Sequence, residues 1–274
     1  NRQVDGMDIV YLDNAATSLK PQSVIDAVSR YYSEVSTNVH RGKSYIMEEA
    51  SNVYEQTRYK VAEFLRCNGN EVVFCKNTTE AINLVSQGLT SERDDWVLTC
   101  ADSHHSNFLP WQQNVRTQCV ALQENGELDL DNYYRLLKGK PALVALTHCS
   151  NVTGTYLPIA QMAAAAKEHG ALVLLDAAQS APHTALDVNL LGVDFLAFSA
   201  HKMLGPTGIG VLYGRKAVLE RLKPLQWGGG MVDWVSLEET RKRKIPHRFE
   251  AGTPNISGVF GLGAALDYLK HLGM

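Results

Sequence analysis

The sequence predicts an α/β fold built on a mostly parallel sheet that is buried on both faces. Two apolar runs, at residues 172–175 and 195–198, each stop at a polar side chain. Runs of this length bounded by polar residues are typical of strands that are covered on both faces. Segments with a helical pattern alternate with such runs along the chain, which indicates one α/β domain.

The clearest unit lies in the middle of the chain. Residues 142–147 have a strand pattern, and residues 158–169 have a helical pattern that Gly170 closes. The run at 172–175 follows directly. The three segments therefore predict a βαβ crossover with two parallel strands.

The N-terminal part of the chain begins this alternation. Pro21 opens a helix whose apolar stripe comprises Val24, Ile25, Val28, Tyr31 and Tyr32. A longer helix is expected at residues 45–66 and a strand at 71–75. A further helical pattern begins beyond Thr79.

The same reading covers the other segments. Strands are expected at residues 97–99, 120–122 and 209–213, and helices at 107–116, 130–137, 216–222 and 259–272. Loops are expected at residues 228–230 and 248–255, which are rich in glycine or in residues typical of turns, and at the basic run 241–244.

Composition excludes several classes of function. The formal net charge of −3 and the pI near 6.3 carry no electrostatic signature of nucleic-acid binding. No apolar stretch has the length of a membrane span, and the first residues do not have the pattern of a signal peptide. The five cysteines have no metal-ligand spacing, so we expect no metal site. Reduced thiols, buried at Cys75, Cys119 and Cys149, would suit the cytoplasm or another reducing compartment.

Polar residues gather after the two apolar runs. Asp176 and Gln179 follow the first run, and Ser199, His201 and Lys202 follow the second. Ligands of open α/β sheets bind at the carboxyl ends of the strands, so these five side chains are expected to meet in one crevice. Pyridoxal phosphate (PLP) needs an amine for covalent attachment and an anion that keeps its ring nitrogen protonated. The alternative is that Asp176 caps a helix and Lys202 is a solvated surface lysine.

Two further segments could complete a PLP site. Thr78 and Thr79 lie between a strand and a helix, where free N–H groups and the helix dipole favour a phosphate, although helix capping alone would also explain them. His104 and His105 follow the strand at 97–99, and an aromatic ring there could lie flat on a pyridine ring. A purely structural role is the alternative for a lone histidine.

With these residues in place, the chain resembles the cysteine desulfurases of the fold-type I, class V aminotransferase superfamily, in particular their SufS/CsdA-like branch. The matching segments span almost the whole chain in the expected order: YLDNAATS, NVHRG, TTEAINLV, SHHSNFLPW, THCSNVTGT, LLDAAQSAPH, FSAHKMLGPTGIGVLYG, WGGGMV and RFEAGTPN. The resemblance implies a fold-type I PLP-dependent large domain.

The resemblance also implies roles around the cofactor. Lys202 would bind PLP covalently and move protons, Asp176 would pair with the ring nitrogen, and Gln179 would bind the ring's phenolic oxygen. His104 would stack on the ring and shuttle protons. The phosphate would be held by Thr79, Ser199 and His201, and Thr78 is a further candidate for binding the cofactor.

Other roles concern the substrate and the partner subunit. Thr253 would reach the phosphate in the neighbouring subunit of a homodimer. Asn151 would meet the substrate carboxylate or the ring oxygen. His40 and Arg41 would lie in a substrate-binding loop near the partner's active site.

The activity implied is conversion of L-cysteine to L-alanine, with the sulfur passed on as a persulfide for iron–sulfur cluster or cofactor assembly through an acceptor protein. In this family a C-terminal domain supplies a nucleophilic cysteine and a carboxylate-binding arginine, and neither is recognisable here. The expected organisation is an N-terminal segment at 1–20, the PLP-binding domain at 21–258, and at 259–274 the start of a helix leading to the missing small domain. Two alternatives stay open: a cysteine-independent PLP enzyme (C–S lyase, selenocysteine lyase or epimerase) and a silent PLP-binding or scaffold domain.

Overall fold

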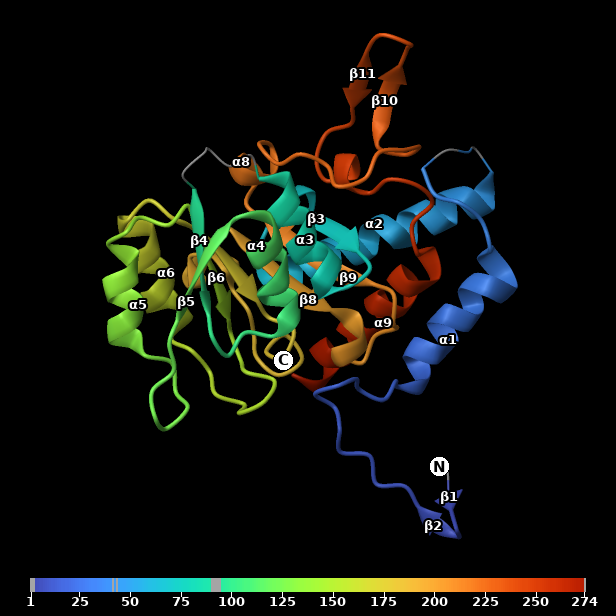
Figure 1. The fold of residues 1–274 in the computed structure, drawn as a ribbon. Helices are drawn as coiled ribbons and strands as arrows, with labels where there is room; N and C mark the ends of the chain where they lie inside the picture. Colours follow the sequence, from blue (N-terminus) through green and yellow to red (C-terminus); the bar gives the residue numbers. More distant parts are fainter. Residues whose placement is uncertain (1–2, 41, 43, 90–94, 274) are drawn as a thin grey trace.

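The computed structural model describes residues 3–40, 42, 44–89 and 95–273, and a sheet of seven strands forms the centre of this part of the chain (Figure 1). β9 runs antiparallel to both of its neighbours, β3 and β8, and the strands from β8 to β5 are parallel to one another. The predicted α/β fold with a mostly parallel sheet is therefore confirmed. In spatial order the strands are β3 (Val72–Cys75), β9 (Gly210–Gly214), β8 (Phe195–Ser199), β7 (Leu172–Asp176), β6 (Leu143–Thr147), β4 (Trp96–Cys100) and β5 (Arg116–Val120).

Helices cover both faces of this sheet. Within β7, Val173 and Leu175 pack into one hydrophobic core, while Leu174 packs into a second core on the opposite face. The alternation follows from the two-residue period of a strand, and it explains why the runs at β7 and β8 are apolar at every position. The first core includes side chains of α2 (Tyr45–Leu65), α5 (Leu130–Leu137), α6 (Ile159–Glu168), α7 (Val188–Leu191) and α9 (Ile256–Leu272). The second includes side chains of α3 (Thr78–Gly88), α4 (Leu109–Asn114) and α8 (Lys216–Leu219).

The predicted crossover unit is present. β6, α6 and β7 follow one another, and β6 pairs with β7 in parallel from Leu143 opposite Leu172 to Thr147 opposite Asp176. The register brings the polar ends of both strands to the same edge of the sheet. No helix in the described residues has both the length and the apolar character needed to cross a membrane.

Two predicted segments have a different structure. The helix expected at 107–116 ends at Asn114, and after Val115 the edge strand β5 begins at Arg116 and ends at Val120, so it occupies earlier residues than the strand expected at 120–122. Val115 and Thr117 are β-branched, which favours an extended chain. The basic run expected to be a loop lies partly in a hairpin of β10 (Val232–Val235) and β11 (Thr240–Lys242), which projects from the body (Figure 1). Most of this hairpin is exposed, so its sequence lacks the apolar alternation that marks a strand.

Burial also departs from expectation at three positions. The stripe predicted for the first helix belongs to α1 (Gln22–Arg30) and the π-helical turn that follows it, but Ile25 and Tyr32 are exposed. Cys119 is exposed as well, because it lies on the edge strand β5. An edge strand has a neighbour on one side only, and an apolar run does not reveal its place in the sheet.

A buried ion pair joins α2 to the loop that contains Thr253. The Arg58 guanidinium donates to both carboxylate oxygens of Glu250, at 2.7 and 3.0 Å, and the side chains are 2% and 7% exposed. Glu250 also accepts from the Phe74 N–H at 2.8 Å and from the Tyr54 hydroxyl at 3.2 Å. Burial by itself raises the pKa of Glu250, but Arg58 outweighs it and holds that pKa below its usual value. Glu250 therefore stays charged and fixes the start of the AGTPN loop.

Replacing Arg58 with methionine should lower the free energy of unfolding by about 3–5 kcal/mol, since Glu250 would remain buried without its cation. Urea denaturation measures the change. Arg30→Met is the matched control, because Arg30 pairs with Glu34 and Glu49 while half exposed, and its loss should cost at most about 1 kcal/mol. Equal losses for the two variants would show that the buried pair is not specially stabilising.

Candidate active site

The carboxyl ends of β6, β7 and β8 open into one cavity of about 440 Å³. Crevices at this edge are where open α/β sheets bind ligands. The structure brings most of the expected site residues together here. Those lining the cavity are Thr78, Thr79, His104, Asn151, Asp176, Gln179, Ser199, His201 and Lys202.

Asp176 is the last residue of β7 and is only 5% exposed. Its Oδ1 accepts from the Ala178 N–H at 2.9 Å. The chain continues in turns, and the next described helix, α7, is capped by Asp187 instead. The helix-cap explanation of Asp176 is therefore wrong. Burial raises the pKa of Asp176 to about 6, although the Ala178 N–H and Lys202 both act to lower it. A cation beside this carboxylate would offset the free-energy cost of burying its negative charge.

Lys202 ends the short 3-10 turn η4 (Ala200–Lys202), which follows β8 directly. It is partly buried and lines the cavity, so it is not the solvated surface lysine of the alternative reading. Burial lowers the pKa of Lys202, and Asp176 opposes that shift. The lowered pKa increases the share of neutral amine, which is the nucleophilic form.

The N-terminal segment holds this turn in place. The His201 carbonyl accepts from the Ser18 N–H at 2.9 Å and from the Thr17 hydroxyl and the Lys20 ammonium, each at 3.0 Å. Gln179 Nε2 donates to the Ala15 carbonyl at 2.9 Å. The sequence reading did not assign this segment to the site, because contacts made through main-chain carbonyls leave no side-chain pattern.

Hydroxyl groups collect at the N-terminus of α3. Asn77 is the cap, since its Oδ1 accepts from the Glu80 N–H at 2.9 Å, so capping does not explain Thr78 and Thr79. Ser199 Oγ lies 2.8 Å from both the Thr78 N–H nitrogen and the Thr78 hydroxyl. These hydroxyls and the amides of an 11-residue helix form a cradle suited to an anion.

His104 lines the cavity, and its Nδ1 accepts from the Ser106 N–H at 3.1 Å. This bond assigns the proton of a neutral ring to Nε2. Burial lowers the pKa of His104, and Lys202 and His105 lower it further. A neutral imidazole therefore stands beside the lysine and the anion cradle, where it can stack on a ring and exchange a proton.

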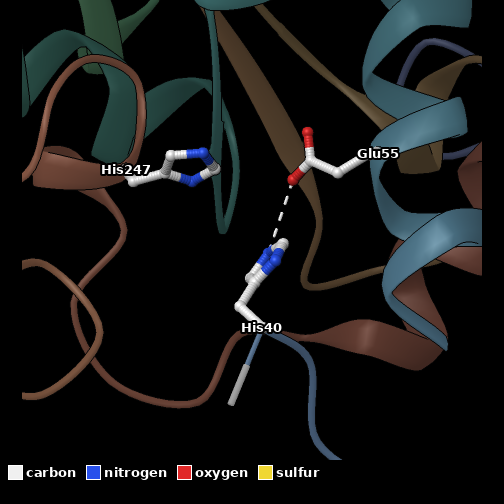
Figure 2. A group of neighbouring side chains, drawn as sticks. All are labelled: His40, Glu55 and His247. Atoms are coloured by element: carbon white, nitrogen blue, oxygen red, sulfur yellow. Dashed lines mark ion pairs between the residues drawn. The ribbon is translucent and has the colours of Figure 1, made fainter. Parts of the chain in front are cut away.

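Two of the expected residues that the structure describes, Thr253 and His40, do not line this cavity. Thr253 lines two others, of about 410 and 140 Å³. His40 faces Glu55 and His247 (Figure 2), and Arg41 lies outside the described residues. Several lining residues were not anticipated by the sequence reading. They are Asp13, Ala15, Ala16, Asn77, Ser106, Thr147, Cys149 and Ala178. All of them except Asn77 lie in segments that carry the family resemblance, and Asn77 directly precedes one, so those segments are the signal that could have found them.

Comparison with known proteins agrees with this geometry. The family model of the class-V aminotransferases matches residues 10–274. A probable cysteine desulfurase of Halalkalibacterium halodurans is 44% identical over all of this chain and 70% of its own length. The apo structure of cysteine desulfurase from Thermococcus onnurineus superimposes with a TM-score of 0.93 at 41% identity, covering 97% of this chain and 68% of that one.

More distant similarity extends to a lyase. The cystine C–S lyase C-DES, solved with its product cysteine persulfide and as a variant with glycine covalently linked to its PLP cofactor, has a TM-score of 0.85 at 25% identity. That match covers 96% of this chain and 72% of the lyase. This chain belongs to the class-V aminotransferase family and, within it, to the cysteine desulfurases.

Proposed function

We propose that the protein is a PLP-dependent cysteine desulfurase that converts L-cysteine to L-alanine and passes the sulfur to a cysteine thiol as a persulfide. The observation that carries the proposal is the presence of Lys202 and Asp176 in one cavity that the anion cradle of α3 also lines. Relatives that match the whole of this chain are named cysteine desulfurases, and this supports the choice of reaction.

The residues of the cavity fit PLP. Thr78, Thr79, Ser199 and His201 would hold the phosphate, because hydroxyls and helix amides donate to its oxygens. The raised pKa of Asp176 fits a buried carboxylate that lacks a full cationic partner, and a protonated ring nitrogen supplies one.

Other contacts would orient the ring. His104 would stack on its face and Asn151 would meet the ring oxygen or the substrate carboxylate. Gln179 would bind the phenolic oxygen by its amide, which now donates to Ala15. The N-terminal segment thus keeps Gln179 at the cavity wall.

The chain's own groups account for the proton movements. When bound, PLP supplies an electron sink for the substrate's α-carbon. Lys202, with its lowered pKa, would attach the cofactor and then take the α-proton as a free amine. His104 Nε2 would carry a proton to or from the substrate, because its Nδ1 is engaged by the Ser106 amide.

Sulfur abstraction needs a thiolate, and the reaction is balanced when L-cysteine and an enzyme thiol give L-alanine and an enzyme persulfide. Among the described residues, Cys149 is the one cysteine that lines the cavity. Burial raises the pKa of Cys149, so it stays a thiol near neutral pH. We therefore infer that the cysteine that accepts the sulfur is not Cys149 and is not among the described residues that line this cavity. In this family, such a cysteine and a carboxylate-binding arginine come from the C-terminal domain.

The proposal extends to partners and organisation. We infer a homodimer, a sulfur-acceptor protein and a reducing compartment, and the five free thiols are consistent with such a compartment. The division into an N-terminal segment at 1–20, a PLP-binding domain at 21–258 and a connecting helix at 259–274 also stays a prediction. Helix α9 contains most of that last segment, and its apolar residues pack into the core beneath the sheet.

Thr253 is expected to serve the partner's active site, since it is exposed and lies outside the cavity of its own subunit. Mixing Thr253→Ala protein with Lys202→Ala protein should form hybrid dimers with one doubly damaged site and one intact site. Activity should then rise well above that of either variant alone. Absence of recovery, despite subunit exchange verified by native mass spectrometry, would place Thr253 outside the partner's site.

The reaction itself is tested by product analysis. Purified full-length protein loaded with PLP and given L-cysteine should form L-alanine, with persulfide appearing on the protein in the first turnover. The second candidate, a cystine C–S lyase, is favoured by the similarity to C-DES and would form pyruvate from cystine. Pyruvate without alanine would replace the desulfurase proposal, and protein that binds PLP without any turnover would favour a silent domain.

A further inference from the structure

Three metal-binding side chains meet away from the catalytic cavity. His40 precedes α2, Glu55 lies within α2, and His247 begins the 3-10 turn η5 (His247–Phe249). One ligand atom from each lies within 4.8 Å of the other two, and His40 Nε2 is 3.4 Å from Glu55 Oε1. Figure 2 shows His40 and His247 approaching from two separate loops and Glu55 from the helix. Segments more than 190 residues apart in sequence thus supply one ligand set.

The neighbours of this cluster hold its ligands in position. Arg58 donates to both oxygens of Glu55, from Nε to Oε2 at 2.9 Å and from Nη2 to Oε1 at 3.3 Å. Arg58 is itself fixed by Glu250, so the Glu55 carboxylate is held with its Oε1 beside His40. The His40 N–H donates to Ser51 Oγ at 3.0 Å, and His40 has a φ of +67°. A non-glycine residue keeps such a conformation only when its surroundings impose it.

The surroundings of both imidazoles favour the neutral form, which is the form that binds metal. Burial lowers the pKa of His40 and of His247, and the nearby Arg58 and Arg243 lower both further, against the opposite effect of Glu55 and Glu250. A neutral ring has a free nitrogen lone pair, so a metal need not displace a proton from it.

The surrounding charges also select the kind of ion. Two carboxylates, Glu55 and Glu250, face two guanidiniums, Arg58 and Arg243. Their charges cancel, so an ion bound by charge alone, such as Mg²⁺ or Ca²⁺, gains little here. An ion that bonds to imidazole nitrogen suits the site better, and two histidines with one carboxylate are a recurring zinc ligand set that leaves a fourth position open.

We propose that His40, Glu55 and His247 form a binding site for zinc or a similar divalent transition metal, with its open position toward the cavity of about 140 Å³ that His40 and His247 line. The ion connects α2 to the segment that runs from His247 through the buried Glu250 to Thr253. The site shares no residue with the cavity of the same subunit that contains Lys202, but Thr253, which the proposed function assigns to the partner's active site, lines the same small cavity.

Cobalt and zinc ions are the probes. Purified protein stripped with a chelator is titrated with Co²⁺, which should produce ligand-field absorption at longer wavelength than the cofactor, saturating at one ion per chain and abolished by Zn²⁺. His247→Gln should weaken binding on the order of 100-fold, since losing a ligand costs at least as much as losing a group that only orients one. His183→Gln is the matched control, because His183 is an exposed histidine outside the cluster and should leave binding unchanged.

A second variant separates the loss of a metal ligand from a failure of the His247→Gln protein to fold. His247→Cys keeps a ligand at the position and should add a thiolate-to-cobalt charge-transfer band, which a purely structural role of His247 would not produce. Unchanged Co²⁺ affinity in His247→Gln would assign any binding to other groups, such as the exposed Cys119, and overturn the proposal. Failure of the wild-type protein to bind Co²⁺ or Zn²⁺, or a His247→Cys complex without the new band, would overturn it equally.

Discussion

Lys202→Ala is expected to reduce desulfurase activity by about 10⁴-fold, because one change removes both the covalent attachment point and the group that moves the α-proton. The fold should survive, since Lys202 lies in a turn whose contacts run through main-chain groups of His201 and Ala200. Alanine formation from L-cysteine measures the effect. Borohydride reduction of the wild-type protein should also leave the cofactor on the peptide that contains Lys202.

The control for this variant is Lys138→Ala. Lys138 is exposed at the end of α5 and does not line the cavity. It should keep full activity and full cofactor content. If Lys202→Ala protein formed alanine at the wild-type rate, or if reduction labelled another lysine, the assignment of the active site would be wrong.

Asp176→Asn is the second large effect, and we expect a fall in kcat of about 100- to 1000-fold. Asparagine has nearly the same shape and can still accept from the Ala178 N–H, so packing should be unchanged. It has no negative charge to keep the ring nitrogen protonated, and the electron sink is weaker without that proton. The KM for L-cysteine should change little. A kcat within a few-fold of the wild-type value would contradict the role given to Asp176.

The same variant tests the charge of Asp176 without any turnover. In cofactor-free protein, burial raises the pKa of Asp176 from 3.8 to about 6, so its stabilising contribution is complete below pH 3.8 and lost as the pH rises through about 6. Above that pH the charged side chain costs on the order of 3 kcal/mol. Cofactor-free Asp176→Asn protein should therefore be more stable than cofactor-free wild type at pH 7, and equally stable near pH 4. Thermal unfolding at the two pH values measures the difference, and a constant difference would contradict a buried, ionising Asp176.

The candidate site could be predicted to a large extent from the sequence. Asp176 and Lys202 end two apolar runs, and parallel strands always bring their carboxyl ends to one edge. That rule of topology turns a linear pattern into a spatial one. The rule does not apply to residues in loops. For that reason the sequence did not predict that the N-terminal segment holds the His201 carbonyl.

Local patterns in the sequence by themselves determined the strands β6, β7 and β8, the crossover α6 and the polar residues that end these strands. They did so because burial on both faces requires apolar side chains at every position of a strand. Only the tertiary structure decided that β5 is an edge strand with an exposed Cys119, that Arg58 and Glu250 form a buried pair, and that His40, Glu55 and His247 meet. Each of these depends on which distant segments become neighbours, and that is set by the packing of the whole core rather than by the periodicity of any one segment.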